Sequence, residues 1–409
     1  MTHPAPSQRT VVTGMGIISA IGKDTETFFR HACMGVSGIS AVRGFPVEEL
    51  SSDRGAEIHD FDVNQHFPGR SDLEKLGRCK QLALSAAAQC MQQADYPVEQ
   101  APGQIGVALG YTQGESKLLE ACCHALEQGE LSQKDIDALG DYPPQSISQQ
   151  LAGEFGFQGP IFTLANACSA SSFAIGAALD LIRLGEVRAM LVGGADAFSH
   201  YGYAGFSRLG AISRNVPRPF SIDRGGMVPG EGAAMMLVES LASARERNAA
   251  ILAEIIGYGE SCDAHHITQP NPKGVAHAIR AALDDAGIHP GDVSFISAHG
   301  TGTQASDRVE SVAFVEIFGA KPPPVTAVKS VLGHAMGAGS AMECVASICA
   351  LQQQIIPPTM NYLGPDPECP VDCVPNRARP TRLNIALKTA SAFGGNNAAV
   401  LFQRWDSHS

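Results

Sequence analysis

Several features that would place this chain in a specialised class of protein are missing from its sequence. No run approaches the roughly 20 apolar residues that span a bilayer. The first residues, Met1 to Arg9, lack the basic and then apolar stretch of a secretory signal. Glycine and proline, 43 and 25 of the 409 residues, form no low-complexity tract. We therefore expect a globular, cytoplasmic protein with no membrane attachment.

Metal and disulfide patterns are also missing. The 11 cysteines are odd in number, Cys122 and Cys123 are adjacent, and no two are separated by the two residues typical of zinc sites. Most of them are expected to be reduced, buried, small apolar side chains. The sequence thus predicts no metal and no disulfide framework.

Basic residues are fewer than acidic ones, and the formal net charge is -12. A nucleic-acid-binding protein needs a clustered excess of Lys and Arg, so we expect no nucleic-acid partner. One local basic stretch contains Arg70, Lys75, Arg78 and Lys80. Such a stretch is typical either of a solvated helix face or of a docking site for an acidic partner.

What the chain does contain is a regular alternation of strand and helix patterns. A helix pattern over Leu82 to Ala94 precedes a strand pattern over Ile105 to Leu109, and the same order recurs at Val275 to Ala286 and Val293 to Ser297. Interleaved strands and helices predict an α/β fold with layered sheets. The recurrence predicts two related halves: residues 1–250 and residues 251–409.

Cys168 lies between a predicted strand, Ile161 to Ala165, and a predicted helix, Ser169 to Leu184. A lone cysteine is usually a small core residue. On a tight turn it points away from the backbone, and the positive end of the helix dipole favours its thiolate. Residues 166–172 are all small, which leaves room for a substrate or a closely approaching backbone. The helix pattern rests on four apolar residues at helical spacing: Phe173, Ala177, Leu181 and Leu184.

Two histidines follow predicted strands. His299 comes after Val293 to Ser297 in a glycine-rich loop, and His334 comes shortly after Val325 to Val328. Ligand-facing positions in open α/β sheets lie at such strand ends. Either histidine alone is more often structural, but two of them with a candidate nucleophile form a rare constellation. Paired N–H donors can hold a carbonyl oxygen as it gains negative charge, which a malonyl thioester needs when it loses carbon dioxide.

Charged residues accompany the histidines. Glu343 lies on an apolar helix after His334, where an unpaired carboxylate would be costly, so we expect a partner such as a backbone amide. Lys329 needs an acidic neighbour, which Asp307 or Glu310 could supply from the helix after His299. Structural support is the expected role of this set.

Four separated motifs of the chain are Asn166 to Ala170 (NACSA), His299 to Thr303 (HGTGT), Lys329 to His334 (KSVLGH) and Phe393 to Asn397 (FGGNN). In this order they resemble the signatures of β-ketoacyl-acyl carrier protein synthase II and its polyketide relatives. An ordered set is far more specific than any single motif. The resemblance, which runs nearly end to end, implies a thiolase-like αβαβα fold. It also implies a homodimer, or a heterodimer with a homologue resembling a chain-length factor.

The resemblance also implies roles for the site residues. Cys168 would accept the acyl group from an acyl carrier protein, in an oxyanion hole made by the backbone amides of Cys168 and Phe393. His299 and His334 would promote decarboxylation of a malonyl unit and hold the enolate that attacks the acyl-cysteine. Lys329 would support this network together with Glu310, and Phe393 would gate the pocket.

Further residues are implied to contact the substrates. Thr301, Thr303 and Thr268 would meet the phosphopantetheine arm of the carrier, and no free cofactor is implied. Gln113 and Met227 would line the acyl pocket. The carrier would dock on six basic residues: Arg70, Lys75, Arg78, Lys80, Arg208 and Arg214.

The sequence departs from the family pattern at several positions, among them Ala392, Gln113 and Met227. Ala392 stands before Phe393 where a glycine is expected, and alanine cannot use the positive φ open to glycine, so the gate is expected to move differently. Gln113 replaces an apolar residue and Met227 a phenylalanine. These changes favour an unreduced, unsaturated or aryl-bearing polyketide chain as substrate. A position of Gln113 at the surface or a dimer interface stays open.

Two other functions are weighed against this one. A thiolase acting on coenzyme A esters usually has a second catalytic cysteine, and Ser391 to Asn397 contains none. A non-catalytic partner resembling a chain-length factor usually lacks the nucleophile that Cys168 supplies. Cys168 with two histidines favours decarboxylative condensation by an active subunit.

Overall fold

The computed structural model describes residues 8–406, whose strands form a main sheet of 10 strands in the order β10-β9-β13-β14-β8-β1-β7-β6-β4-β5. The strands of one half are β1 (Thr10–Ser19), β4 (Ile105–Gly110), β5 (Ile161–Leu164), β6 (Ala189–Asp196) and β7 (Gly232–Ser240). Those of the other half are β8 (Ala253–Cys262), β9 (Phe295–Ser297), β10 (Val325–Thr326), β13 (Ile385–Ser391) and β14 (Asn396–Arg404).

The two halves of the sheet share one topology. From the centre outward, the first strand of each half is followed by its fifth, fourth, second and third strands. In both halves the outer three strands run parallel and the inner pairs antiparallel. The two half-sheets are joined where Thr10 to Val12 of β1 pairs with Ala253 to Ile255 of β8. The division at residue 250 falls in the connection between α8 (Leu241–Glu246) and β8.

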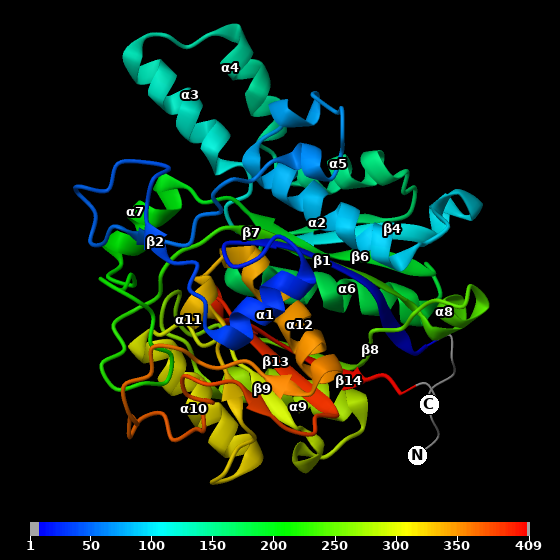
Figure 1. Ribbon diagram of the computed structural model, residues 1–409, viewed down its shortest axis with the longest axis vertical. Helices are drawn as coiled ribbons and strands as arrows, with labels where there is room; N and C mark the ends of the chain where they lie inside the picture. The colour runs from blue at the N-terminus through cyan, green and yellow to red at the C-terminus, as the bar shows by residue number, and fades with distance from the viewer. Residues whose placement is uncertain (1–7, 407–409) are drawn as a thin grey trace.

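Helices make three layers around the two half-sheets, as Figure 1 shows. On one outer face α2 (Arg78–Ala94) packs against β1 and β7, with α5 (Gln145–Phe155) beside it. On the other outer face α9 (Pro272–Ala286) covers β8 and β14, and α10 (Gln304–Phe318) packs on α9. Between the halves lie α6 (Ala170–Leu184) and α12 (Met336–Gln353). The predicted α/β, thiolase-like αβαβα fold is confirmed.

The described chain also contains further helices and short strands. The helices are α1 (Thr25–Met34), α3 (Ser116–Gln128), α4 (Gln133–Ala138), α7 (His200–Arg208) and α11 (Lys329–Leu332), and the short strands are β2 (Ser40–Ala41), β3 (Arg54–Gly55), β11 (Ile355–Ile356) and β12 (Arg379–Pro380). In Figure 1, α3 and α4 project from the body as an arm.

The central helices are the most deeply buried part of the fold. Every residue of α12 from Met336 to Leu351 is buried, as expected for a helix enclosed on all sides. The stretch Ala167 to Leu184 is apolar and long enough by composition to cross a membrane, but 61% of it is buried inside the protein. The expected apolar stripe of α6 is wrong, because Leu184 is 75% exposed. The buried face comprises Ala174, Ile175, Ala178, Leu179 and Ile182.

Candidate active site

Cys168 occupies a 3-10 turn, Ala167–Ser169, between β5 and α6, as predicted. Ala167 adopts a left-handed conformation with φ of 59°, which is strained for a residue with a Cβ. Ser169 Oγ donates to the carbonyl oxygen of Asn396 at 3.1 Å and ties the turn to the start of β14. The turn thus holds a buried thiol, 8% exposed, in a fixed direction.

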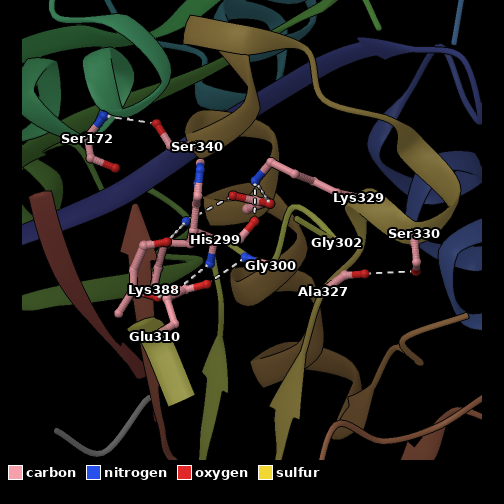
Figure 2. A network of polar contacts seen from close by, with 12 residues as sticks. Ser172, His299, Gly300, Gly302, Glu310, Ala327, Lys329, Ser330, Ser340 and Lys388 are labelled. Carbon is pink, nitrogen blue, oxygen red and sulfur yellow. Dashed lines mark hydrogen bonds and ion pairs between the residues drawn. The ribbon is translucent and has the colours of Figure 1, made fainter. Parts of the chain in front are cut away.

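The small residues around Cys168 let backbones approach closely. A Cβ on Gly110 would collide with the backbone of Ser171, and one on Gly337 would collide with the backbone of Tyr111. Ser171 Oγ donates to the Gly337 carbonyl, and Ser340 Oγ accepts from the Ser172 amide at 3.2 Å (Figure 2). Of the two explanations for these small residues, close packing of α6 on β4 and α12 accounts for them.

The two histidines lie next to each other. Their ring centroids are 5.4 Å apart and the rings are nearly perpendicular, at 85°. His299 follows β9, and His334 follows α11 and is held by its amide donating to the Val228 carbonyl at 2.7 Å. Both side chains are buried, 5% and 2% exposed. Strands β9 and β10 are neighbours in the sheet, so their carboxyl ends bring the two loops together.

One cavity of about 610 Å³, including its open mouth, connects Cys168 with both histidines. Eight of the predicted site residues line it: Cys168, Met227, Thr268, His299, Thr301, Thr303, His334 and Phe393. Phe206 of α7 also lines it, with its ring centroid 5.7 Å from that of Phe393. Motifs that are far apart in the sequence therefore form a single site.

Gln113 does not line this cavity. Its side-chain oxygen accepts from Ser199 Oγ at 3.0 Å, beside Gly202 of α7. The loop after β4 turns the Gln113 amide toward α7 in the single chain. Of the two residues predicted for the acyl pocket, Met227 lines the cavity, and its side chain is 4% exposed.

Ala392, the departure expected to alter the gate, has an extended backbone with φ of -140°. The positive φ angles of this loop fall instead on Gly394 and Gly395, at 83° and 80°. The alanine is therefore unstrained in the conformation seen here. Phe393 is 37% exposed at the cavity mouth.

Burial controls the protonation of the three central groups. It raises the pKa of the Cys168 thiol to about 12, although the Lys329 ammonium acts in the opposite direction. Burial, reinforced by Lys329, lowers the pKa of His299 and of His334 well below the usual value. Burial therefore opposes the thiolate that the start of α6 was expected to favour. The site presents a thiol beside two neutral imidazoles.

The expected partner of Lys329 is also wrong. Its Nζ contacts Glu343 Oε1 and donates to the His299 carbonyl oxygen at 2.8 Å (Figure 2). Glu310 instead accepts the amides of His299 and Gly300, at 2.8 and 2.7 Å. Because these donors occupy Glu310, and α12 places Glu343 beside the lysine, the ion pair forms with Glu343.

Asp307 and Glu343 each have other contacts than expected. Asp307 accepts the amides of Phe220 and Gly302, at 2.9 and 3.1 Å, and so shapes the glycine-rich loop. Glu343 is fully buried and pairs with lysines, where a backbone amide was expected. The supporting role predicted for these carboxylates agrees with their contacts, but the pairing differs.

Much of the predicted docking stretch faces inward. Lys80 is 2% exposed and pairs with Asp141 at 2.6 Å. Arg78 pairs with Glu231 at 2.8 Å and stacks on Phe61. These two residues are therefore removed from the docking prediction, because helix α2 turns them toward the protein. Of the remaining four, Arg70 is half-buried against Asp72 and Glu154, while three are exposed: Lys75, Arg208 and Arg214.

Sequence reasoning missed Asp196, which ends β6. This fully buried carboxylate accepts four backbone amides, from Thr112, Gln113 and Gly114 after β4 and from Gly337 in α12, at 2.6 to 2.9 Å. Burial raises its pKa to about 6. An acidic residue directly after the apolar run Met190 to Ala195 was the available signal. Asp196 joins the two segments that flank the Cys168 turn.

We expect Asp196→Ala to destabilise the protein by about 4 kcal/mol, because it leaves buried amides without an acceptor. Urea unfolding followed by circular dichroism measures this. Asp180→Ala, at an exposed position of α6, is the control and should change stability by less than about 0.5 kcal/mol. Equal stabilities of the two variants would contradict the role assigned to Asp196.

Known families and solved structures are similar to nearly the whole chain. The family model described as Beta-ketoacyl synthase, N-terminal domain, matches residues 7–244, and the model of the C-terminal domain matches residues 252–363. The chain belongs to the β-ketoacyl synthase family. The curated 3-oxoacyl-[acyl-carrier-protein] synthase 2 of Staphylococcus aureus strain COL is 34% identical, over 98% of this chain and 99% of its own.

Solved structures of β-ketoacyl synthases show the same fold. One described as the ishigamide ketosynthase/chain length factor is 39% identical, with a TM-score of 0.92 over 97% of this chain and 99% of that chain. Another, described as AntDE:AntF, a type II polyketide synthase acyl-carrier protein in complex with its ketosynthase bound to the hexaketide, is 29% identical, with a TM-score of 0.88 over 97% and 99%.

These findings confirm the predicted family and the predicted reaction class. The protein is a condensing acyltransferase, and condensation in fatty acid or polyketide synthesis is its activity. Among residues 8–406, no group of three or more His, Cys, Asp or Glu side chains could hold a metal ion.

Proposed function

We propose that this synthase joins a Cys168-bound acyl chain to a malonyl unit, with loss of carbon dioxide, and that both partners arrive on acyl carrier protein. The observation that carries the proposal is the meeting of Cys168, His299 and His334 in one buried cavity. The test is conversion of acyl and malonyl carriers to a 3-oxoacyl carrier with release of carbon dioxide. Failure of the purified protein, alone and with a partner homologue, would overturn it.

Acyl transfer comes first in the proposed sequence. The Cys168 thiol loses its proton to a neutral imidazole as sulfur attacks the acyl thioester, and the backbone amides of Cys168 and Phe393 hold the oxyanion. The carrier thiolate leaves and takes that proton. Because both imidazoles are neutral in the resting site, either can accept the proton.

Decarboxylation and condensation follow. The bond from the malonyl carboxylate to its carbon breaks, carbon dioxide leaves, and the electron pair becomes an enolate whose oxygen accepts N–H donors from His299 and His334. The enolate carbon attacks the acyl-cysteine and the C–S bond breaks. A proton from solvent restores the Cys168 thiol.

The remaining site residues position these groups in the proposal. Lys329 and Glu310 hold the His299 loop through its carbonyl and amide, with Glu343 and Asp307 behind them. Phe393 gates the mouth. Thr301, Thr303 and Thr268 meet the phosphopantetheine arm, so the substrates bring their own prosthetic group and no free cofactor is needed. Lys75, Arg208 and Arg214, with the half-buried Arg70, face the acidic carrier.

An unreduced, unsaturated or aryl-bearing polyketide chain is the proposed substrate. Met227 in the cavity wall, where the family pattern has a phenylalanine, supports this choice, while Gln113 lies outside the cavity of the single chain. We expect polyunsaturated acyl carriers to be elongated at least about tenfold faster than saturated ones of equal length, an expected difference of about 1.4 kcal/mol in transition-state binding. Equal rates measured by product mass spectrometry would contradict this specificity.

We propose that the enzyme works in the cytoplasm as a dimer, with an identical chain or with a homologue resembling a chain-length factor. Strand β5 is an edge of the main sheet and exposes Ile161 and Phe162, and the projecting arm exposes Leu126 and Ile136. Exposed apolar edges of this kind are usually covered in the assembled protein. Light scattering of the purified chain, with and without the co-expressed homologue, distinguishes the two dimers.

A further inference from the structure

A second buried lysine, Lys388, lies behind the two histidines. It belongs to β13, where it pairs with Ser297 of β9 on one side and Val400 of β14 on the other. Its side chain is 0% exposed, and its ammonium lies 2.9 Å from Glu343 Oε2. Burial of a charged lysine is costly without a specific partner. None of the roles assigned so far uses this residue.

Lys388 and Lys329 form ion pairs with the same carboxylate, that of Glu343. Lys329 contacts Glu343 Oε1, whereas Lys388 contacts Oε2. The same Lys329 ammonium donates to the His299 carbonyl at 2.8 Å. A chain of contacts therefore runs from β13 through α12 and α11 to the loop that carries His299, and Figure 2 shows Lys388 and Lys329 on opposite sides of this network.

The next residue of β13 extends the support to the other carboxylate. Thr389 Oγ1 donates to Glu310 Oε1 at 2.8 Å, and Glu310 accepts the amides of His299 and Gly300. Successive residues of one strand thus contact both carboxylates that hold the His299 loop. The strand continues to Ser391 and then to Phe393 at the cavity mouth.

The charges at this place depend on Lys388. Lys329 and Lys388 bring two positive charges, and Glu310 and Glu343 bring two negative ones. Without Lys388 the two carboxylates would outnumber the one remaining lysine behind a cavity in which a negative enolate forms. In a buried site such a charge acts with little screening by water.

We propose that Lys388 is a positioning residue of the condensation reaction: it fixes Glu343 on Lys329, and thereby His299, and supplies positive charge behind the enolate. The proposal rests on the function proposed above. It predicts two separable effects of losing Lys388, a less ordered His299 loop and a change in the charge felt by both histidines.

The protonation of the histidines gives the readout. Lys388 is among the groups that lower the pKa of both histidines, after burial and Lys329, and for His299 also after His334. Removing its charge raises both pKa values, so a larger fraction of each imidazole is protonated at mildly acidic pH and cannot accept the Cys168 proton. The other titratable groups around the histidines remain in the variant: Cys168 before α6, Lys329 on α11, Asp307 and Glu310 on α10, and Glu343 on α12. Lys388 also lowers the pKa of Lys329 and of Glu310, so the pKa values of these two groups rise with those of the histidines.

The experiment compares Lys388→Met, Lys388→Gln and Lys388→Arg with the unchanged enzyme. Single-turnover acylation of Cys168 and release of carbon dioxide from a malonyl carrier are measured across the acidic pH range. We expect Met and Gln to move the acid limb of acylation to higher pH and to slow decarboxylation about ten- to a hundredfold at neutral pH. Arginine keeps the charge, so its acid limb should stay near that of the unchanged enzyme.

Arg247→Met is the matched control, because it also removes one partner of a buried carboxylate, Glu239, outside the cavity. It should lower stability without moving the acid limb. The Lys388→Gln variant can still donate a hydrogen bond to Glu343, so it can be measured even if the Lys388→Met variant does not fold. An acid limb that stays in place in Met and Gln overturns the inference. If the wild-type enzyme neither becomes acylated nor releases carbon dioxide, the proposed function is overturned instead.

Discussion

Cys168→Ala is expected to gain no acyl mass from acyl carrier protein and to lose at least about a thousandfold in condensation rate, because no other thiol among residues 8–406 lines the cavity beside the histidines. The direct measurement is intact-protein mass spectrometry after incubation with an acyl carrier, followed by a product assay with the malonyl carrier. Because burial raises the pKa of Cys168 to about 12, the proposed acylation also requires a neutral imidazole to accept the thiol proton.

A matched control is available on the projecting arm. Cys123 is an exposed thiol on α3, and Cys123→Ala should gain the same acyl mass as the unchanged enzyme. This comparison separates acylation at the site from chemical transfer to an accessible cysteine. If Cys168→Ala gained as much mass as the unchanged enzyme, Cys168 would not be the acyl acceptor.

His299→Ala is expected to acylate at a rate close to that of the unchanged enzyme but to decarboxylate malonyl carrier about 10²- to 10³-fold more slowly. His334 remains to accept the thiol proton, whereas the enolate loses one of its two N–H donors. The measurement pairs single-turnover acylation with release of labelled carbon dioxide. The two steps are thus separated in one variant.

His277→Ala is the control for this second prediction, since His277 is exposed on α9. Both steps should proceed normally in it. Loss of acylation and decarboxylation together in His299→Ala, with the fold intact by circular dichroism, would contradict the division of roles. It would show that His299 holds the whole site in place.

The candidate nucleophile and the histidines could be predicted because their signals are local. A strand followed by a glycine-rich loop or a tight turn is encoded by adjacent residues, so Cys168, His299 and His334 could each be placed at the end of a strand. The order of the four sequence motifs then assigned these three residues to one active site. The α/β layering followed from the same alternation of patterns.

Ion pairs between residues that are far apart in the sequence could not be predicted from these local signals. Lys329 has two plausible carboxylates on the helix after His299, yet it pairs with Glu343, because Glu310 is occupied by backbone amides. In the sequence Lys80 belongs to a basic stretch, but in the structure its side chain is buried and pairs with Asp141. Asp196 and Lys388 carry no motif at all. Each of these outcomes depends on what a distant element presents to the side chain.

The sequence by itself therefore determined the layered fold, the family and the three groups expected to do the chemistry, since strand, turn and helix signals depend on neighbours in the chain. Only the tertiary structure decided which charges are buried together, which face of α6 is covered, and that Gln113 lies outside the cavity. The physical reason is desolvation. Burial sets the pKa of Cys168, His299 and His334 and forces each buried charge to find a partner, and both effects arise only when separate segments pack together.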